Sequence, residues 1–142
     1  MRIAGVVADA NVLLSAVVGK AALRVFSDFG LTVHAAKFTV DEVAEYLPAM
    51  AAQYRLSAEL VAIQWKLLPL RVHQRHDYGR CFAEAQADLA RRDPEDAHAL
   101  ALARCLRLPL WSNDRDFEGL GIECYPTARL LALLKHAKEA GE

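Results

Sequence analysis

Residues 92–117, RDPEDAHALALARCLRLPLWSNDRDF, decide how the rest of the chain is organised. Asp93 is a helix-capping residue type, Pro94 fits the first position of a helix, and Asp96 falls in the first turn. The body of this helix, residues 97–106, is apolar on nearly every face, so we expect it to be deeply buried.

A short strand and an acidic loop follow that helix. Residues 108–111, LPLW, form an apolar run of strand type, and residues 112–116, SNDRD, come directly after it. Acids at a helix start and just past a strand end are the arrangement that a metal site on an α/β sheet requires.

The composition indicates a globular protein whose bulk charge says little about partners. The 142 residues, 54% hydrophobic and 25% charged, predict a single soluble domain spanning residues 1–142 with a substantial core. The formal net charge is −1, so bulk charge gives no reason to expect nucleic-acid binding. Any such binding must rest on a local patch or on a metal.

The cysteines and the N-terminus bear on the cellular compartment. Cys81, Cys105 and Cys124 are widely spaced without a CxxC pair, which argues against a zinc site or a disulfide framework and favours a reducing cytoplasm. The apolar N-terminus resembles a signal peptide superficially, but Asp9 and Asn11 interrupt it, and no other run reaches about 18 apolar residues. We therefore expect a cytoplasmic protein that does not enter a membrane.

Strand-like and helix-like segments alternate along the chain. We expect strands at 3–8, 31–35, 67–72, 108–111 and 122–125, and helices at 11–18, 21–29, 39–47, 58–66, 81–90, 97–106 and from 127 onward. Residues 3–8 read as a strand buried on both faces, and Pro69 favours an edge position for its strand. The alternation predicts a three-layer α/β/α sandwich with a central, mainly parallel sheet.

Several helix boundaries have recognisable sequence patterns. Thr39 and Glu42 have the spacing of a capping box, and Pro48 is expected to break or kink the helix that follows. Ser57 and Thr127 are expected to cap two later helices.

Three carboxylates are expected at one edge of the sheet. Ligands of open α/β sheets bind beyond the carboxyl ends of the strands, where the strand order reverses. Asp9 and Asp114 both follow predicted strands, and Asp96 joins them if its helix begins at the same edge. Clustered carboxylates repel unless a cation neutralises them, and hard cations such as Mg²⁺ or Mn²⁺ prefer oxygen ligands.

Most of these acids also have a structural explanation that involves no metal. Asp96 could serve only to balance the helix dipole. Glu42 fits a capping role, which leaves Glu45, one turn later, as the better ligand. Asp114 and Asp116 could be ordinary turn residues.

Three other features have a structural explanation that we prefer. His98, on a buried helix, is best explained as a hydrogen-bonded core histidine, and Trp111 as a core residue rather than a base-stacking platform. The basic segment 71–80, RVHQRHDYGR, is expected to be a solvated surface, with RNA or a partner protein as the alternative role.

Four motifs together resemble a known family. They are VVADANVLLSAVVG (6–19), TVDEVAEYL (39–47), DPEDAHALALA (93–103) and WSNDRDF (111–117). In this order they resemble the PIN-domain proteins, metal-dependent ribonucleases that include the toxin components of bacterial toxin–antitoxin systems. Each motif is only moderately specific, but four in family order span most of the chain.

The resemblance implies a set of site residues. The acidic, catalytic and metal-binding quartet would be Asp9, Glu45, Asp96 and Asp114, with Asp116 as a further ligand and Asn11 and Ser112 as supporting polar residues. Serine at position 112 replaces the threonine often found there and keeps the hydroxyl. The spacing permits Glu42 in place of Glu45.

The resemblance also implies a chemistry and partners. Mg²⁺ or Mn²⁺ would polarise an RNA phosphodiester and lower the pKa of a bound water that attacks it. The partners would be the RNA substrate, an antitoxin protein, and a second copy of the chain in a homodimer. Apolar helices such as residues 58–66 could leave a face to bury against such a partner.

Two other function classes remain open at this stage. A haloacid-dehalogenase-like phosphatase is suggested by Asp9 and the residues after its strand, but that family usually has a second aspartate where Asn11 stands. The other class is a non-catalytic module whose acids hold a structural ion or a partner. Retention of the four acids argues against the second class.

Overall fold

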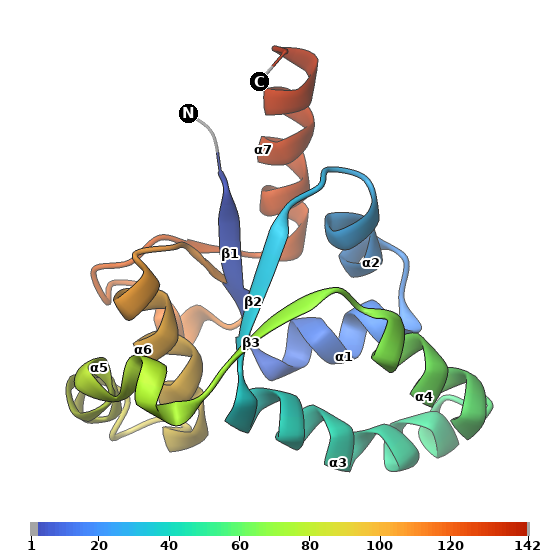
Figure 1. Cartoon of the computed structure of the whole chain (residues 1–142), viewed down its shortest axis with the longest axis horizontal. Helices are drawn as coiled ribbons and strands as arrows, with labels where there is room; N and C mark the ends of the chain where they lie inside the picture. Colours follow the sequence, from blue (N-terminus) through green and yellow to red (C-terminus); the bar gives the residue numbers. More distant parts are fainter. Residues whose placement is uncertain (1–2, 142) are drawn as a thin grey trace.

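A parallel five-stranded sheet forms the centre of the computed structural model, which describes residues 3–141 (Figure 1). Its strands are β1 (Gly5–Ala8), β2 (Thr32–Ala36), β3 (Leu70–His73), β4 (Leu110–Trp111) and β5 (Cys124–Tyr125). They lie in the order β3-β2-β1-β4-β5, and every neighbouring pair is parallel. The predicted parallel sheet and the edge position of β3 are confirmed.

The strand order reverses between β1 and β4. The chain moves outward from β1 to β2 and β3, and then returns to place β4 on the other side of β1. Ala8 pairs with Trp111, so the two strands end level with each other. The residues that follow them, Asp9 and Ser112, therefore leave the sheet side by side at the position where α/β folds bind ligands.

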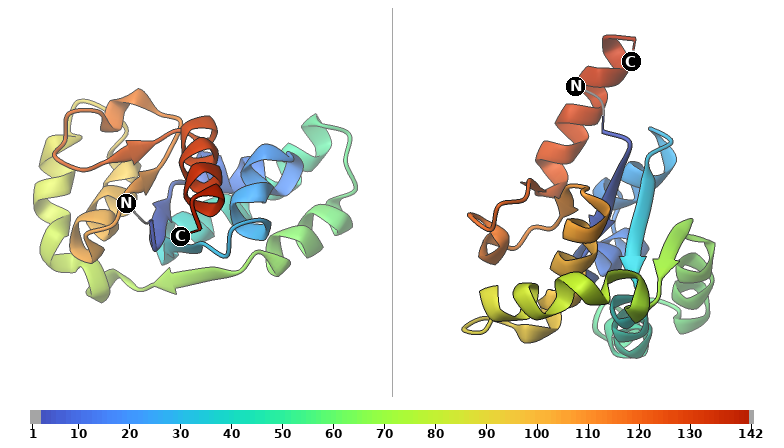
Figure 2. Two further views of the ribbon diagram at one scale, coloured as in Figure 1. Left: turned by 90° about the horizontal axis from the view of Figure 1, so that it is seen from above. Right: turned by 60° about the vertical axis from the view of Figure 1, so that its left-hand side comes forward.

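Helices cover both faces of the sheet. They are α1 (Ala10–Val18), α2 (Ala21–Ser27), α3 (Lys37–Gln53), α4 (Ala58–Leu67), α5 (Arg75–Asp88), α6 (Ala97–Leu106) and α7 (Thr127–Glu139), with 3₁₀ turns η1 (Pro94–Asp96) and η2 (Arg115–Phe117). Side chains alternate along a strand, so Val6 and Ala8 enter one core with α1–α4 and α7, while Val7 enters another with α5 and α6. This gives the predicted three layers (Figure 2).

Helix α6, which was predicted at residues 97–106, is buried as expected. Most of α6 is inaccessible to solvent, and the helix ends at Arg107 in the left-handed conformation with φ 56°. Asp93 caps the preceding turn by accepting a hydrogen bond from the Glu95 amide at 3.0 Å. Trp111 is fully buried in the core and donates its indole hydrogen to Thr127 Oγ1 at 2.9 Å.

The beginning of α3 differs from the prediction. The helix starts at Lys37, directly after β2, with Ala36 at the N-cap position. Thr39 is therefore a buried residue of the first turn, and the predicted capping box with Glu42 is wrong. The helix also continues through Pro48 to Gln53, so of the two expected effects of Pro48, a break or a kink, the break is wrong.

Two other helix starts correct the sequence interpretation. Helix α5 begins at Arg75 rather than at residue 81, because Gln74 and Asp77 form a capping box there. Most of the basic segment 71–80 is thus helical. Helix α7 has Pro126 at its N-cap, and the Thr127 hydroxyl bonds Trp111 instead. The predicted cap at Ser57 is confirmed, since its hydroxyl accepts from the Leu60 amide.

No single helix within residues 3–141 combines the length and hydropathy needed to cross a membrane. Helices α1 and α2 meet those criteria only when joined, and they are bent by 94° at the break between them.

Candidate metal centre

Asp9 connects β1 to α1 and is almost completely buried. It is the N-cap of α1, where its Oδ1 accepts a hydrogen bond from the Val12 amide at 3.0 Å. Its Oδ2 accepts a hydrogen bond from the Ser112 hydroxyl, and only 4% of the residue is exposed. Burial raises the pKa of Asp9, and the charge of Asp114 raises it further, although the bonds from Ser112 and Val12 oppose the rise.

Ser112 links the ends of the two central strands. Its hydroxyl donates to Asp9 and accepts a hydrogen bond from the Asp114 amide at 3.0 Å. Asp114 caps η2, because its Oδ1 accepts from the Asp116 amide at 2.8 Å. Arg92 donates a hydrogen bond to the Asp116 carbonyl, which connects the two ends of the segment 92–117.

Asp96 belongs to the same acidic cluster as Asp9 and Asp114. It is partly buried at the junction of η1 and α6. Burial raises the pKa of Asp96 to about 7, and the negative charges of Asp93, Asp9, Asp114 and Asp116 contribute to the rise. Residues distant in sequence therefore converge at the β1–β4 end of the sheet.

Helix α3 brings Glu42 to the cluster. Burial, a hydrogen bond with Glu95 and the charge of Glu95 raise the pKa of Glu42 to about 8, and Asp93 and Asp96 add to the rise. Glu45 lies almost one turn further along α3 and is exposed. Of the two glutamates, the structure places Glu42 beside the acids of residues 93–96.

Two acids near Glu42 were not predicted from the sequence to be site residues. Glu95 and Asp93 both act on Glu42, but the sequence indicated only a capping role for Asp93 and no role for Glu95.

The predicted supporting residue Asn11 lies exposed in the first turn of α1, where its backbone amide bonds Asp9. Asn113 lies next to Ser112, and its Oδ1 accepts from the Thr127 amide at 2.9 Å, which positions the start of α7.

The acidic cluster fits a hard divalent cation. Among residues 3–141, no three histidine, cysteine, aspartate or glutamate side chains are arranged to chelate one ion. Mg²⁺ does not require such a cage, because it commonly takes one or two carboxylates and keeps several waters. The donors are all carboxylate oxygens, and the raised pKa values show that ionising the cluster is costly without a compensating positive charge.

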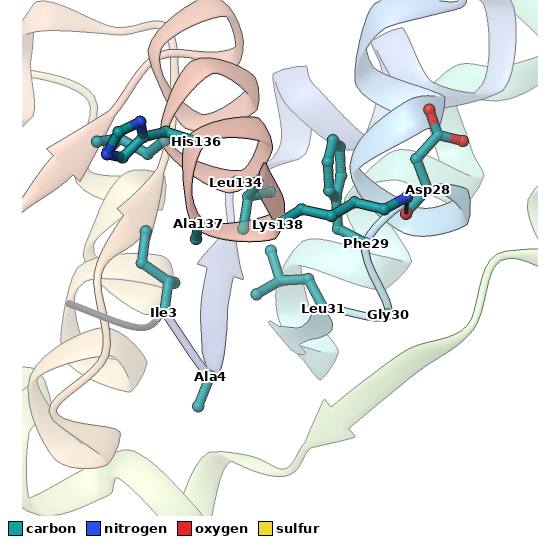
Figure 3. A pocket seen from close by; sticks show the side chains of 11 residues that line it. Ile3, Ala4, Asp28, Phe29, Gly30, Leu31, Leu134, His136, Ala137 and Lys138 are labelled. Carbon is teal, nitrogen blue, oxygen red and sulfur yellow. Dashed lines mark hydrogen bonds between the residues drawn. The ribbon is translucent and has the colours of Figure 1, made fainter. Parts of the chain in front are cut away.

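One cavity lies away from the acids. A cavity of about 490 Å³ is lined by Ile3 and Ala4 before β1, by the segment from Asp28 to Leu31, and by α7 residues such as Lys138 (Figure 3). Ile3 and Ala4 precede β1, whereas Asp9 follows it, so this cavity is at the opposite end of the strand from the acids.

The fold and the site define an α/β domain with a carboxylate cluster at its topological switch point. The chain belongs to the PIN domain family, whose model matches residues 7–135, and proteins of this family are nucleases. No curated protein sequence matches the chain.

Solved structures show the same fold. PAE2754 from Pyrobaculum aerophilum is 16% identical with a TM-score of 0.69, covering 94% of this chain and 96% of that one. VapBC2 from Rickettsia felis, bound to a DNA fragment from their promoter, is 11% identical with a TM-score of 0.66, covering 86% of this chain and 98% of that one.

Proposed function

We propose that this protein is a metal-dependent endoribonuclease that hydrolyses RNA phosphodiester bonds at the acidic cluster. The observation that carries the proposal is the convergence of Asp9, Asp96 and Asp114 at the β1–β4 switch point. One or two of the carboxylates of Asp9, Asp96 and Asp114 would hold Mg²⁺ or Mn²⁺ together with water, with Asp116 and Glu42 beside them. When bound, the ion would supply an activated water and neutralise charge on the phosphate.

The protein's own residues prepare the site. The Val12 amide and the Ser112 hydroxyl each bond one oxygen of Asp9, which fixes the orientation of the carboxylate. A carboxylate oxygen can accept more than one hydrogen bond, so both oxygens remain able to bind a ligand. Ser112 also bonds the Asp114 amide, and this shared contact keeps the two acids in a constant relative position.

Purified protein incubated with labelled single-stranded RNA tests the proposal. We expect cleavage with Mg²⁺ or Mn²⁺ and none with EDTA, because the acids cannot neutralise or activate phosphate by themselves. A generic phosphate monoester, added as a control, should remain intact, which distinguishes this activity from that of a phosphatase. RNA cleavage that persists undiminished in excess EDTA would disprove the mechanism.

We infer that Glu42, rather than Glu45, acts at this site. Glu42→Gln should reduce the cleavage rate about 10- to 100-fold, the range found when groups that orient or support metal ligands are removed. Glu45→Gln, a matched change on the same helix, should leave the rate within about twofold of wild type, since exposed substitutions rarely matter. Initial rates on one RNA measure both, and the opposite ranking would restore Glu45 as the functional residue.

We also propose that a protein partner covers α4. Leu60, Ile63 and Leu67 are all exposed, and their spacing places them along one face of the helix. The partner would be a second copy of the chain or a small antitoxin; one structural neighbour is VapBC2 on promoter DNA. Light scattering that gives a monomer mass at all concentrations would exclude the homodimer.

A further inference from the structure

An aromatic stack connects the two helices that carry Glu42 and Asp96. Phe38 lies in the first turn of α3, four residues before Glu42, so the two side chains are neighbours on one helix face. Its ring stacks on His98 of α6, with centroids 3.9 Å apart and an angle of 10° between the planes. Because Glu42 lies beside the acids of residues 93–96, the stack borders the acidic cluster.

The ring beneath Phe38 is held in a fixed orientation. His98 Nδ1 and the Tyr78 hydroxyl form a hydrogen bond of 2.7 Å, which agrees with the predicted role of a hydrogen-bonded core histidine. The Phe82 ring packs against His98 with centroids 4.7 Å apart, and the exposed Arg75 guanidinium lies 3.6 Å from the centre of the Phe82 ring. Tyr78 and Phe82 are buried, so they form a rigid support.

Phe38 differs from its neighbours because 39% of it remains exposed. Folding is favoured by burying a phenyl ring, so its exposure beside the acids has no evident structural benefit. A flat, partly exposed ring on a rigid aromatic support is the form of surface on which unpaired nucleic-acid bases stack.

The charge of the protein makes such a contact useful. Nucleic-acid-binding proteins usually gain most of their affinity from lysine and arginine contacts to phosphates. This chain has a formal net charge of −1 and concentrates carboxylates at its site, so this attraction is weak. Stacking does not depend on charge and can supply the missing affinity next to the cluster.

We propose that Phe38 is a base-stacking subsite, on which one unpaired base of a single-stranded RNA stacks so that a nearby phosphodiester reaches the acidic cluster. This inference rests on the proposed ribonuclease function and names how its substrate is held. The substrate is single-stranded because a base within a duplex is already stacked and paired.

Three full-length variants test this subsite. Phe38→Leu keeps an apolar side chain but removes the flat ring, and Phe38→Trp keeps a ring. Tyr54→Leu is the matched control: Tyr54 caps the end of the same helix, is 57% exposed, and lies sixteen residues beyond Phe38. Thermal unfolding of each variant verifies that the fold is retained.

The measurements are KM and kcat for a short single-stranded RNA, and fluorescence anisotropy for binding of the same RNA in EDTA. We expect Phe38→Leu to raise KM and the dissociation constant about 5- to 100-fold, the range for losing one stacked base. Phe38→Trp and Tyr54→Leu should stay within about threefold of wild type, because the first keeps an aromatic ring in the stack and the second is remote from it. Equal effects of Phe38→Leu and Tyr54→Leu would overturn the subsite.

An abasic-site scan gives a second, independent readout. RNAs that lack one base at successive positions should lose affinity for the wild type at one particular position. Phe38→Leu should be insensitive to that same position, because its contact with the base is already lost. If both proteins respond equally at every position, Phe38 does not stack on a base and its exposed ring serves another contact.

The two proposals fail in distinguishable ways. RNA that is cleaved in Mg²⁺ with a KM unaffected by Phe38→Leu would overturn the subsite and leave the ribonuclease function standing. RNA that binds in a Phe38-dependent way but is never cleaved with any metal would support the subsite and overturn the catalytic proposal.

Discussion

Asp96→Asn is expected to reduce RNA cleavage at least about 100-fold while the protein remains folded. Asparagine keeps the shape of aspartate and loses its charge, so the cluster would bind a divalent cation poorly. Asp96 is also the acid whose pKa responds to four other carboxylates, which identifies it as a central member of the cluster. Asp9→Asn should have a similar effect, because the asparagine oxygen can still accept from the Val12 amide and its NH2 group can donate to Ser112 Oγ.

Initial rates of cleavage at saturating Mg²⁺ measure this effect, and Asp41→Asn is the matched control. Asp41 precedes Glu42 on α3, but it is exposed and pairs with Lys37, so its removal also costs one negative charge without changing the cluster. We expect the control to cleave RNA at nearly the wild-type rate, since such surface ion pairs contribute little. Near-normal cleavage by Asp96→Asn would show that the cluster is not the catalytic centre.

The stability of the metal-free protein should fall as the pH rises from 5 to 9. The folded-state pKa values are about 7 for Asp96 and about 8 for Glu42, above the ordinary values of 3.8 and 4.5. The folded state therefore binds protons that the unfolded state releases. Their contribution to stability is complete below about pH 4 and is lost as the pH passes through 7 and 8.

Thermal unfolding in EDTA measures this loss, which we expect to be about 2 kcal/mol after allowance for solvent screening, or about 5 °C. At pH 8, Asp96→Asn should melt at a higher temperature than the wild type, because one repelling charge is gone. Mg²⁺ at a hundredfold excess over its dissociation constant should stabilise the wild type by about 2.7 kcal/mol.

The variant should gain much less from Mg²⁺ than the wild type. This comparison separates metal binding at the cluster from a general effect of salt, which would act on both proteins alike. If Mg²⁺ raises both melting temperatures equally, Asp96 does not take part in a metal site.

Local sequence patterns were sufficient for the architecture. The apolar run before Asp9 predicted a central buried strand, and the apolar body of residues 97–106 predicted a buried helix. The alternation of strands and helices predicted a parallel sheet. The position of Asp9 and Asp114 after strands then placed both acids at one edge, because parallel strands end there together.

Helix starts were less predictable, because similar residue patterns occur inside helices and at their ends. The Thr39–Glu42 spacing matches a capping box, yet α3 already begins at Lys37, where β2 ends. The true capping box of α5 uses Gln74 and Asp77, a glutamine variant that the serine and threonine pattern does not cover.

By itself, the sequence determined the parallel α/β fold and the acids that lie just beyond its strands, because periodicity and strand ends are local properties. Only the tertiary structure placed Glu42, rather than Glu45, beside the acids of residues 93–96. The two side chains are about 60° apart around α3, so the docking of that helix brings only one of them to the cluster. The tertiary structure also stacks Phe38 of α3 on His98 of α6, although the two helices are far apart in the sequence. Contacts of this kind depend on how helices pack across the sheet, and no local pattern records that geometry.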